Sequence, residues 1–323
     1  MKRKPVEYLN LILKGIAMGA ADVIPGVSGG TIALITDIYE ELIDSIKSIG
    51  SKNIFLLFKN NGIRRFIEAT NAYFLLSVLL GIAISLLSLS HLMQFLLANY
   101  PIYIWSFFFG LILASAWFVG KTISKWNTYT VINLIIGIAA GFWVTTITPA
   151  ETTANSWFIF ICGAIAVCAM ILPGISGSFI LLLLGKYAYM MGALTSLNIG
   201  IIAIFAAGAL IGIISFSKVL SFLLHRFHAQ TIAILTGFMI GSLNKIWPWK
   251  VSIQTFIDAH GIIKPLVEKN VLPNTFLYEN STEPHTVMAI LFALIGIALV
   301  VILEHINVSK VDEEEDLRKK LGF

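Results

Sequence analysis

The sequence predicts an all-α polytopic membrane protein, and its composition and charge distribution are the basis for this prediction. Only 12% of the 323 residues are charged, while 57% are hydrophobic. Soluble domains carry about 25% charged residues. Three long stretches, 69–120, 126–150 and 187–217, contain no charged residue. Each is longer than the roughly 20 apolar residues that cross a bilayer as a helix.

The chain contains an internal repeat. The pattern Pro-Gly-x-Ser-Gly at residues 25–29 returns at residues 173–177, 148 positions later. A second block, GIAISLLSLSHLMQFLL from Gly81, aligns with GALIGIISFSKVLSFLL from Gly208, 127 positions later. The two offsets differ by 21 residues, the length of the basic segment 51–71 that only the first half carries. An ordered pair of matching blocks favours duplication over chance similarity between apolar segments.

Each half is therefore expected to hold a re-entrant helical hairpin, broken by proline and glycine, and then three transmembrane helices. The hairpins are expected at about 8–47 and 157–192, with an amphipathic insert at 51–71. The transmembrane helices are expected near 72–98, 102–120, 128–148, 199–224, 230–247 and 286–304. Three crossings are an odd number, so residues 151–323 should form a repeat that is inverted relative to residues 1–150. The predicted fold class is two inverted-topology repeats.

Basic residues indicate which side each loop faces. In this topology one side carries Lys2, Arg3, Lys4, Lys47, Lys52, Lys59, Arg64, Arg65, Lys121, Lys125, Arg226 and the basic residues of the tail. The short loops of the other side, NYP and TPAETTANS, contain neither Lys nor Arg. By the positive-inside rule, both termini are expected in the cytoplasm. The loop at about 248–285 has mixed charges and is expected on the outer side.

The two broken hairpins are predicted to bind an anion. Inside a membrane the backbone leaves helical geometry only where protein or a watery cavity satisfies its polar groups. A new helix begins after each break, and the first N–H groups of a helix lack partners and carry the positive end of its dipole. The candidate binding residues are Ser28, Gly29, Gly30, Thr31, Ser176, Gly177 and Ser178, and the turns are formed by Pro25, Gly26, Pro173 and Gly174. Alternatively, these small residues only let helices pack closely.

Charged residues near the hairpins are candidates for proton coupling or charge steering. They are Asp22, Glu40, Lys186, Arg64 and Arg65. Asp22 lies just before the first break and acts either as a protonation switch or as a cap of the following helix. Desolvation and a bound anion favour its protonated form, whereas the positive helix end favours the carboxylate. Simpler explanations exist for the other four. Glu40 can be solvated at the cytoplasmic mouth, Lys186 can extend its ammonium group to the membrane surface, and the two arginines can anchor to lipid headgroups.

Neither a metal site nor a cofactor is expected. Cys162 and Cys168 lie in an apolar segment and lack the spacing of metal ligands, so core packing accounts for them. The net charge of +4 reflects Lys and Arg next to membrane helices, which argues against a nucleic-acid partner.

The broken hairpins also carry a resemblance to a known family. GAADVIPGVSGGTIALITDIYEELI, residues 19–43, and LPGISGSFILLLLGKY, residues 172–187, resemble the DUF368 family of bacterial and archaeal membrane proteins. Members are described as polyprenyl-phosphate (undecaprenyl-phosphate) transporters. The resemblance covers essentially the whole chain. It implies translocation of this lipid carrier across the cytoplasmic membrane for recycling in cell-wall and surface-polymer synthesis, with no catalytic residues. The expected partners are the polyprenyl-phosphate lipid and membrane lipids, and a homodimer remains open.

Two other functions fit parts of the pattern. Integral undecaprenyl-pyrophosphate phosphatases use inverted hairpins with the motif P-G-x-S-R-S, but Gly29 and Gly177 stand at the arginine position here. The second hairpin also has no acidic residue between positions 156 and 189. Hydrolysis would lack its charge clamp, so transport is favoured over catalysis. A small-anion permease is the third reading, since helix N-termini alone do not reveal a lipid tail.

Overall fold

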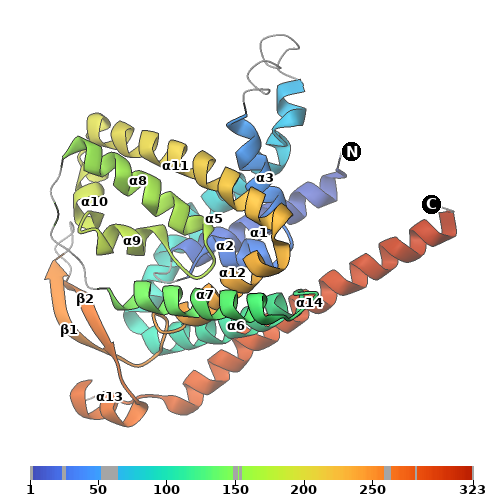
Figure 1. The fold of residues 1–323 in the computed structure, drawn as a ribbon. Coiled ribbons are helices and arrows are strands. Elements are labelled where there is room, and N and C mark those ends of the chain that lie inside the picture. Colours follow the sequence, from blue (N-terminus) through green and yellow to red (C-terminus); the bar gives the residue numbers. More distant parts are fainter. Residues whose placement is uncertain are drawn as a thin grey trace.

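The computed structural model describes residues 3–23, 27–51, 65–147, 152, 155–257, 263–280 and 282–321 (Figure 1). The N-terminal part contains α1 (Pro5–Asp22), α2 (Gly29–Ile35), α3 (Tyr39–Ile49), α5 (Ala72–Asn99), α6 (Pro101–Lys121) and α7 (Thr128–Thr146). The C-terminal part contains α8 (Ser156–Ile171), α9 (Gly177–Leu183), α10 (Tyr187–Thr195), α11 (Ile199–Arg226), α12 (His228–Ser242) and α14 (Thr286–Leu321). Residues 65–69 form a further helical turn before α5.

The helices confirm a polytopic α-helical membrane protein. Among the described residues, five helices are long and apolar enough to cross a bilayer, namely α5, α6, α7, α11 and the first part of α14. The pair α9 and α10, bent by 115°, adds a sixth if it counts as one span. The helix expected at 230–247 is shorter, because α12 ends at Ser242 and turns follow it. In these turns the Asn244 side chain donates a hydrogen bond to Thr145 Oγ1 at 2.9 Å, which ties the chain to α7.

The loop after α12 contains a small sheet that the sequence pattern did not predict. Strands β1 (Lys250–Ile257) and β2 (Ile263–Asn270) pair antiparallel and are followed by α13 (Pro273–Asn280). Trp249 is buried in a second apolar cluster with Ile102 and Phe276, and its Nε1 donates to Pro284 O at 2.8 Å. Figure 1 shows the sheet at the end of the bundle opposite both chain termini.

Among the described residues, the most extensive helix contacts join α1 with α5, α8 with α11, α7 with α12, and α6 with α14. Glycines set the close approach of these pairs. A Cβ at Gly15 would lie 2.3 Å from Val78 O, and one at Gly208 would lie 1.9 Å from Phe160 O. These contacts also give the relative direction of α1 and α5. Gly15 lies against Val78, and Gly19, further along α1, lies against Ile82, further along α5. Helices α1 and α5 therefore run the same way.

Corresponding helix ends share their backbone geometry. Tyr100, between α5 and α6, has φ −133° and ψ 45°, and Phe227, between α11 and α12, has φ −133° and ψ 48°. These two residues are separated by the offset of 127 found in the sequence. Asp37 after α2 and Gly185 after α9 both have positive φ, 56° and 64°, and are separated by the offset of 148. The repeated sequence blocks thus adopt repeated local structures.

Candidate functional site

The two broken segments lie against each other inside the bundle. Ser28 Oγ, before α2, donates to Met170 O of α8 at 2.7 Å. In return, the Gly174 N–H of the second break donates to Thr31 Oγ1 of α2 at 3.0 Å. The Ser28 and Thr31 side chains are fully buried. Two broken segments that are about 145 residues apart in sequence therefore form one buried junction, in which side chains of the first segment satisfy backbone groups of the second.

At the first break, side chains of the protein already accept the N–H groups that open α2. Asp22 Oδ1 accepts from the Gly29 N–H at 2.7 Å, and Ser28 Oγ accepts from the Gly30 N–H at 3.0 Å. The Asp22 carboxylate thus stands where the sequence analysis expected an anion, and the capping contact foreseen as one of its two roles is present. Glycine is required at position 30, since a Cβ there would lie 2.2 Å from Ile171 O.

The second break differs from the first. Ser176 is the N-cap residue of α9, yet its side chain makes no capping hydrogen bond, and its Oγ lies 2.7 Å from Ser178 Oγ. Met170 holds the position that corresponds to Asp22, and within the described part of the chain no carboxylate caps this helix start. Gly174 has φ 89°, a conformation that glycine adopts without strain. The start of α9 is thus the less occupied of the two, and Gly177 and Ser178 are partly accessible there.

The remaining candidates have different surroundings. The residues Pro25, Gly26 and Arg64 lie outside the described part of the chain. Pro173 is buried in the second turn, and Arg65 is exposed. Glu40 Oε1 lies 2.9 Å from His228 Nε2 at the start of α12. Lys186 is buried, and its Nζ donates to Thr152 O at 2.5 Å.

Two residues that the sequence analysis did not select contact the broken segments. Lys14 Nζ of α1 donates to Thr36 O at 2.5 Å, at the C-terminal end of α2, where the helix dipole is negative. Tyr39 OH donates to Ile171 O at 3.3 Å, next to the junction. Lys14 was recognisable as a cation inside an apolar run, which is a functional signal in membrane segments. The contact of Tyr39 joins segments that are distant in sequence, so no local sequence pattern could indicate it.

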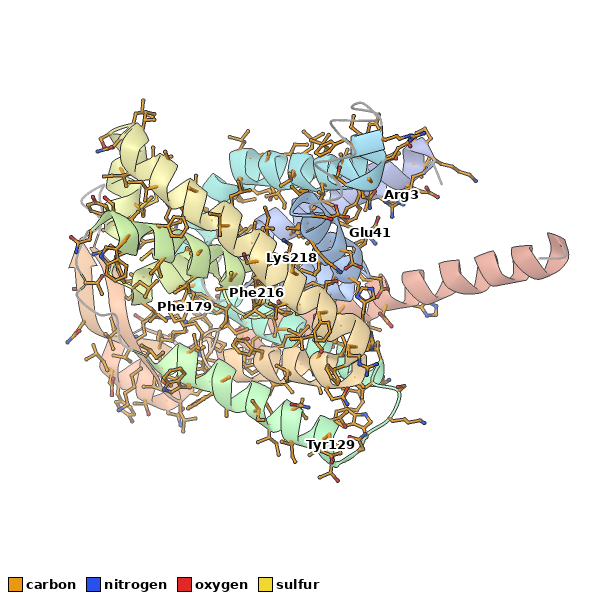
Figure 2. All side chains as sticks on the ribbon, turned by 45° about the horizontal axis from the view of Figure 1, so that its top comes forward. Arg3, Glu41, Tyr129, Phe179, Phe216 and Lys218 are labelled. Carbon is orange, nitrogen blue, oxygen red and sulfur yellow. The ribbon has the colours of Figure 1, made fainter. Side chains whose placement is uncertain are left out.

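A second charged group lies at the end of the bundle where both termini are found. Arg3 Nη2 lies 2.6 Å from Glu41 Oε2, and both residues are labelled in Figure 2. Glu41 also accepts from Asn71 Nδ2 at 2.6 Å. Asp44 accepts from Ser221 Oγ at 2.5 Å and pairs with His225 Nε2 at 3.4 Å. These contacts join α3 to the start of α1 and to α11.

Comparisons of the sequence with known proteins all point to the same family. A family model described as VCA0040-like, undecaprenyl phosphate translocase-like, matches residues 18–264. A polyprenyl-phosphate transporter of Vibrio cholerae serotype O1 is 43% identical over 304 residues, which are 94% of this chain and 98% of the relative. A polyprenyl-phosphate transporter of Staphylococcus aureus is 35% identical over 277 residues, 78% of this chain and 93% of the relative. No solved structure matches. The family resemblance of the broken segments is thereby confirmed, and the chain belongs to the undecaprenyl phosphate translocase-like family.

Proposed function

We propose that this protein moves polyprenyl phosphate across the cytoplasmic membrane, and that the lipid phosphate passes the junction of the two broken segments. The observation that carries the proposal is the direct contact between these segments, through Ser28 with Met170 O and Gly174 with Thr31. Family membership and the names of both relatives support the choice of substrate. The returned carrier would serve cell-envelope polymer synthesis again.

The architecture we propose is a pair of inverted repeats, 1–150 and 151–323, each with a re-entrant hairpin. The common direction of α1 and α5 supports this architecture, because a re-entrant hairpin would return the chain to its starting side before α5 begins. In the second part, Phe160 meets Gly208 and Ala164 meets Gly212, so α8 and α11 are related in the same manner.

The direction of α12 supports the proposed inversion. Gly137 meets Ile234 and Gly141 meets Phe238, so α7 and α12 run the same way. Helix α6 connects to α7 through six residues, 122–127, and returns across the bundle before it. The repeat offset of 127 pairs α12 with α6, so these two counterparts run in opposite directions. This relationship is expected of inverted-topology transporter repeats.

The phosphate would be held by N–H groups and hydroxyls of the helix starts. At α9 these are the groups of Ser176, Gly177 and Ser178, which no carboxylate of the described residues caps. At α2 the phosphate would have to displace the Asp22 carboxylate from the Gly29 N–H or share that donor with it. Protonation of Asp22 weakens it as an acceptor and frees the donor, which links the movement of the phosphate to the movement of a proton.

A phosphatase is the alternative function of this hairpin pattern. It needs an arginine in the motif to clamp the phosphates in the transition state. Gly29 and Gly177 occupy that position in the two hairpins. A Cβ at Gly29 would lie 2.6 Å from Asp22 Oδ2, so a longer side chain requires the carboxylate to move. Transport needs no such clamp, and these residues therefore favour it.

Transport can be tested with purified full-length protein in liposomes. A fluorescent polyprenyl phosphate is placed in both leaflets, and the fraction that a membrane-impermeant quencher reaches is followed over time. We expect rapid exchange between leaflets with the protein and slow exchange in protein-free liposomes, with no release of inorganic phosphate from undecaprenyl pyrophosphate. Equal exchange in both preparations would refute transport. Phosphate release would instead identify an enzyme, and efflux of small anions a permease.

A further inference from the structure

A cleft with three lysines opens at the end of the bundle opposite the termini. It has a volume of about 260 Å³ and lies between the sheet, the end of α7, the turn after α12, and α9. Its walls include Lys245, Lys250, Glu268, Lys269, Asn244 and Phe179. Three cations and one carboxylate give this group of side chains a positive balance.

Lys250 is the most unusual side chain of the cleft. Its side chain is only 7% exposed, and its Nζ makes no hydrogen bond to any of the described residues. Nζ lies 3.8 Å from the centroid of the Trp105 ring and 3.7 Å from Glu268 Oε2. An ammonium group has three donors, and a buried cation without hydrogen bonds is costly. The cation is therefore under-coordinated and can accept a further anionic ligand.

Glu268 is shared between two cations. The same oxygen that faces Lys250 lies 3.2 Å from Lys245 Nζ. Burial favours the neutral acid, but the charges of Lys250 and Lys245 outweigh it and hold the pKa of Glu268 below its usual value. Burial lowers the pKa of Lys250 to about 8, although Glu268 opposes this shift. One carboxylate thus serves as the internal counter-ion of both lysines.

The cleft also touches the second broken segment. Phe179 lies on α9, three residues after Ser176, and Lys245 Nζ sits 4.8 Å from the centroid of its ring. Figure 2 labels Phe179 on the side of the bundle near the sheet. An anion in the cleft would therefore rest against the short helix whose start is the more open part of the junction.

We propose that this cleft captures the phosphate group of a polyprenyl phosphate on the side of the membrane opposite the termini, with Lys245 and Lys250 binding it in place of Glu268. The inference rests on the proposed function, because it gives that substrate an entry point ahead of the junction. The chemistry required is a phosphate monoester, whose charge exceeds that of the displaced carboxylate. Its apolar tail would remain in the bilayer.

Binding of geranylgeranyl phosphate to the full-length protein in nanodiscs tests the proposal, with inorganic phosphate and geranylgeraniol as comparison ligands. Lys250→Met keeps the side-chain length and leaves Glu268 paired with Lys245. We expect it and Lys245→Met to weaken binding at least about tenfold, the usual effect of losing a charge-assisted contact. Glu268→Gln removes the competing carboxylate and should strengthen binding. The matched control is Lys125→Met, since Lys125 is exposed and does not line the cleft.

The outcomes separate this inference from the transport proposal. Stronger binding by the Glu268→Gln variant could not result from misfolding. Unchanged or weaker binding by that variant would contradict the proposal that the phosphate replaces Glu268. Equal affinity for inorganic phosphate and geranylgeranyl phosphate would assign the cleft to free phosphate and overturn lipid capture. If the two lysine variants bind and transport like the wild type, capture of the phosphate in the cleft is refuted and the transport proposal stands. Binding that depends on Lys250, in a protein that fails to transport, would refute transport alone.

Discussion

Asp22 shows how much one residue can and cannot reveal from sequence. Its place before a Pro-Gly break was enough to predict either a cap or a proton switch, and its carboxylate does accept from the Gly29 N–H at 2.7 Å. The contact between Ser28 Oγ and Met170 O spans 142 residues, and no local pattern encodes such a pairing. The positions of the helix starts were therefore predictable from residue types, but the side chains that accept hydrogen bonds from their first N–H groups were not.

Asp22→Asn separates the two roles, because Asn also caps helices but does not titrate. We expect the variant to bind lipid phosphate and to lose the dependence of transport on a pH gradient. The measurement is lipid exchange in liposomes with and without an imposed gradient. If the variant keeps the wild-type response to the gradient, Asp22 is a cap only and coupling lies elsewhere.

The buried Lys250 predicts a pH effect on stability. Its pKa is about 8 in the folded protein and 10.5 for the free side chain, so the unfolded chain binds more protons between these values. Stability should therefore rise with pH across this window, and the shift corresponds to about 3 kcal/mol. We expect the unfolding temperature of wild type, relative to Lys250→Met, to increase from about pH 7.5 to about pH 9.5. Parallel curves for the two proteins would contradict the buried charge that Trp105, Glu268 and Lys245 surround.

At the scale of elements, apolar runs in the sequence predicted the positions of most helices correctly. The run expected at 72–98 is α5, and it ends at Asn99 because the chain turns at Tyr100 before Pro101. The sheet β1–β2 was missed, since its strands lie in a segment of mixed charge without regular alternation of apolar and polar residues. Helix α12 ends at Ser242, before the expected position 247, and Asn244 in the turns after it donates to Thr145 of α7, a contact that sequence periodicity does not contain.

Glycines at helix crossings give a prediction about element packing. Gly208→Ala should destabilise the protein, because the new Cβ would lie 1.9 Å from Phe160 O and push α11 away from α8. Gly192→Ala is the matched control in α10, where nothing lies within 4 Å of the added Cβ. Higher helix propensity should make the control neutral or up to about 1 kcal/mol more stable. Unfolding temperatures in detergent measure both, and equal stability of the two variants would disprove close packing at Gly208.

At the scale of the molecule, the repeat offsets in the sequence return as matching helix ends, such as Tyr100 and Phe227. Composition was sufficient to predict a polytopic membrane protein, and the ordered blocks were sufficient to propose the inverted repeats. The junction between the repeats brings together residues far apart in sequence, so its hydrogen bonds became visible only in the folded chain. Both termini lie at the same end (Figure 1), as the distribution of basic residues suggested.

Labelling of single cysteines tests the orientation, after replacement of Cys162 and Cys168 by alanine. Asn155→Cys should react with a membrane-impermeant thiol reagent added outside intact cells, and Lys125→Cys should react only after permeabilisation. Both native residues are exposed, so access to the reagent is decided by the side of the membrane. Labelling of position 155 only after permeabilisation would reverse the proposed topology.

The most direct test of the central claim measures transport after both hydroxyls at the open helix start are removed. Ser176→Ala/Ser178→Ala deletes the pair of oxygens that lie 2.7 Å apart, and Ser88→Ala removes an exposed hydroxyl of α5 as the control. We predict that leaflet exchange of polyprenyl phosphate falls at least about tenfold in the double variant, as expected for lost hydrogen bonds to a charged group. The control should exchange at the wild-type rate. A folded double variant that also exchanges at the wild-type rate would contradict passage of the phosphate through this junction.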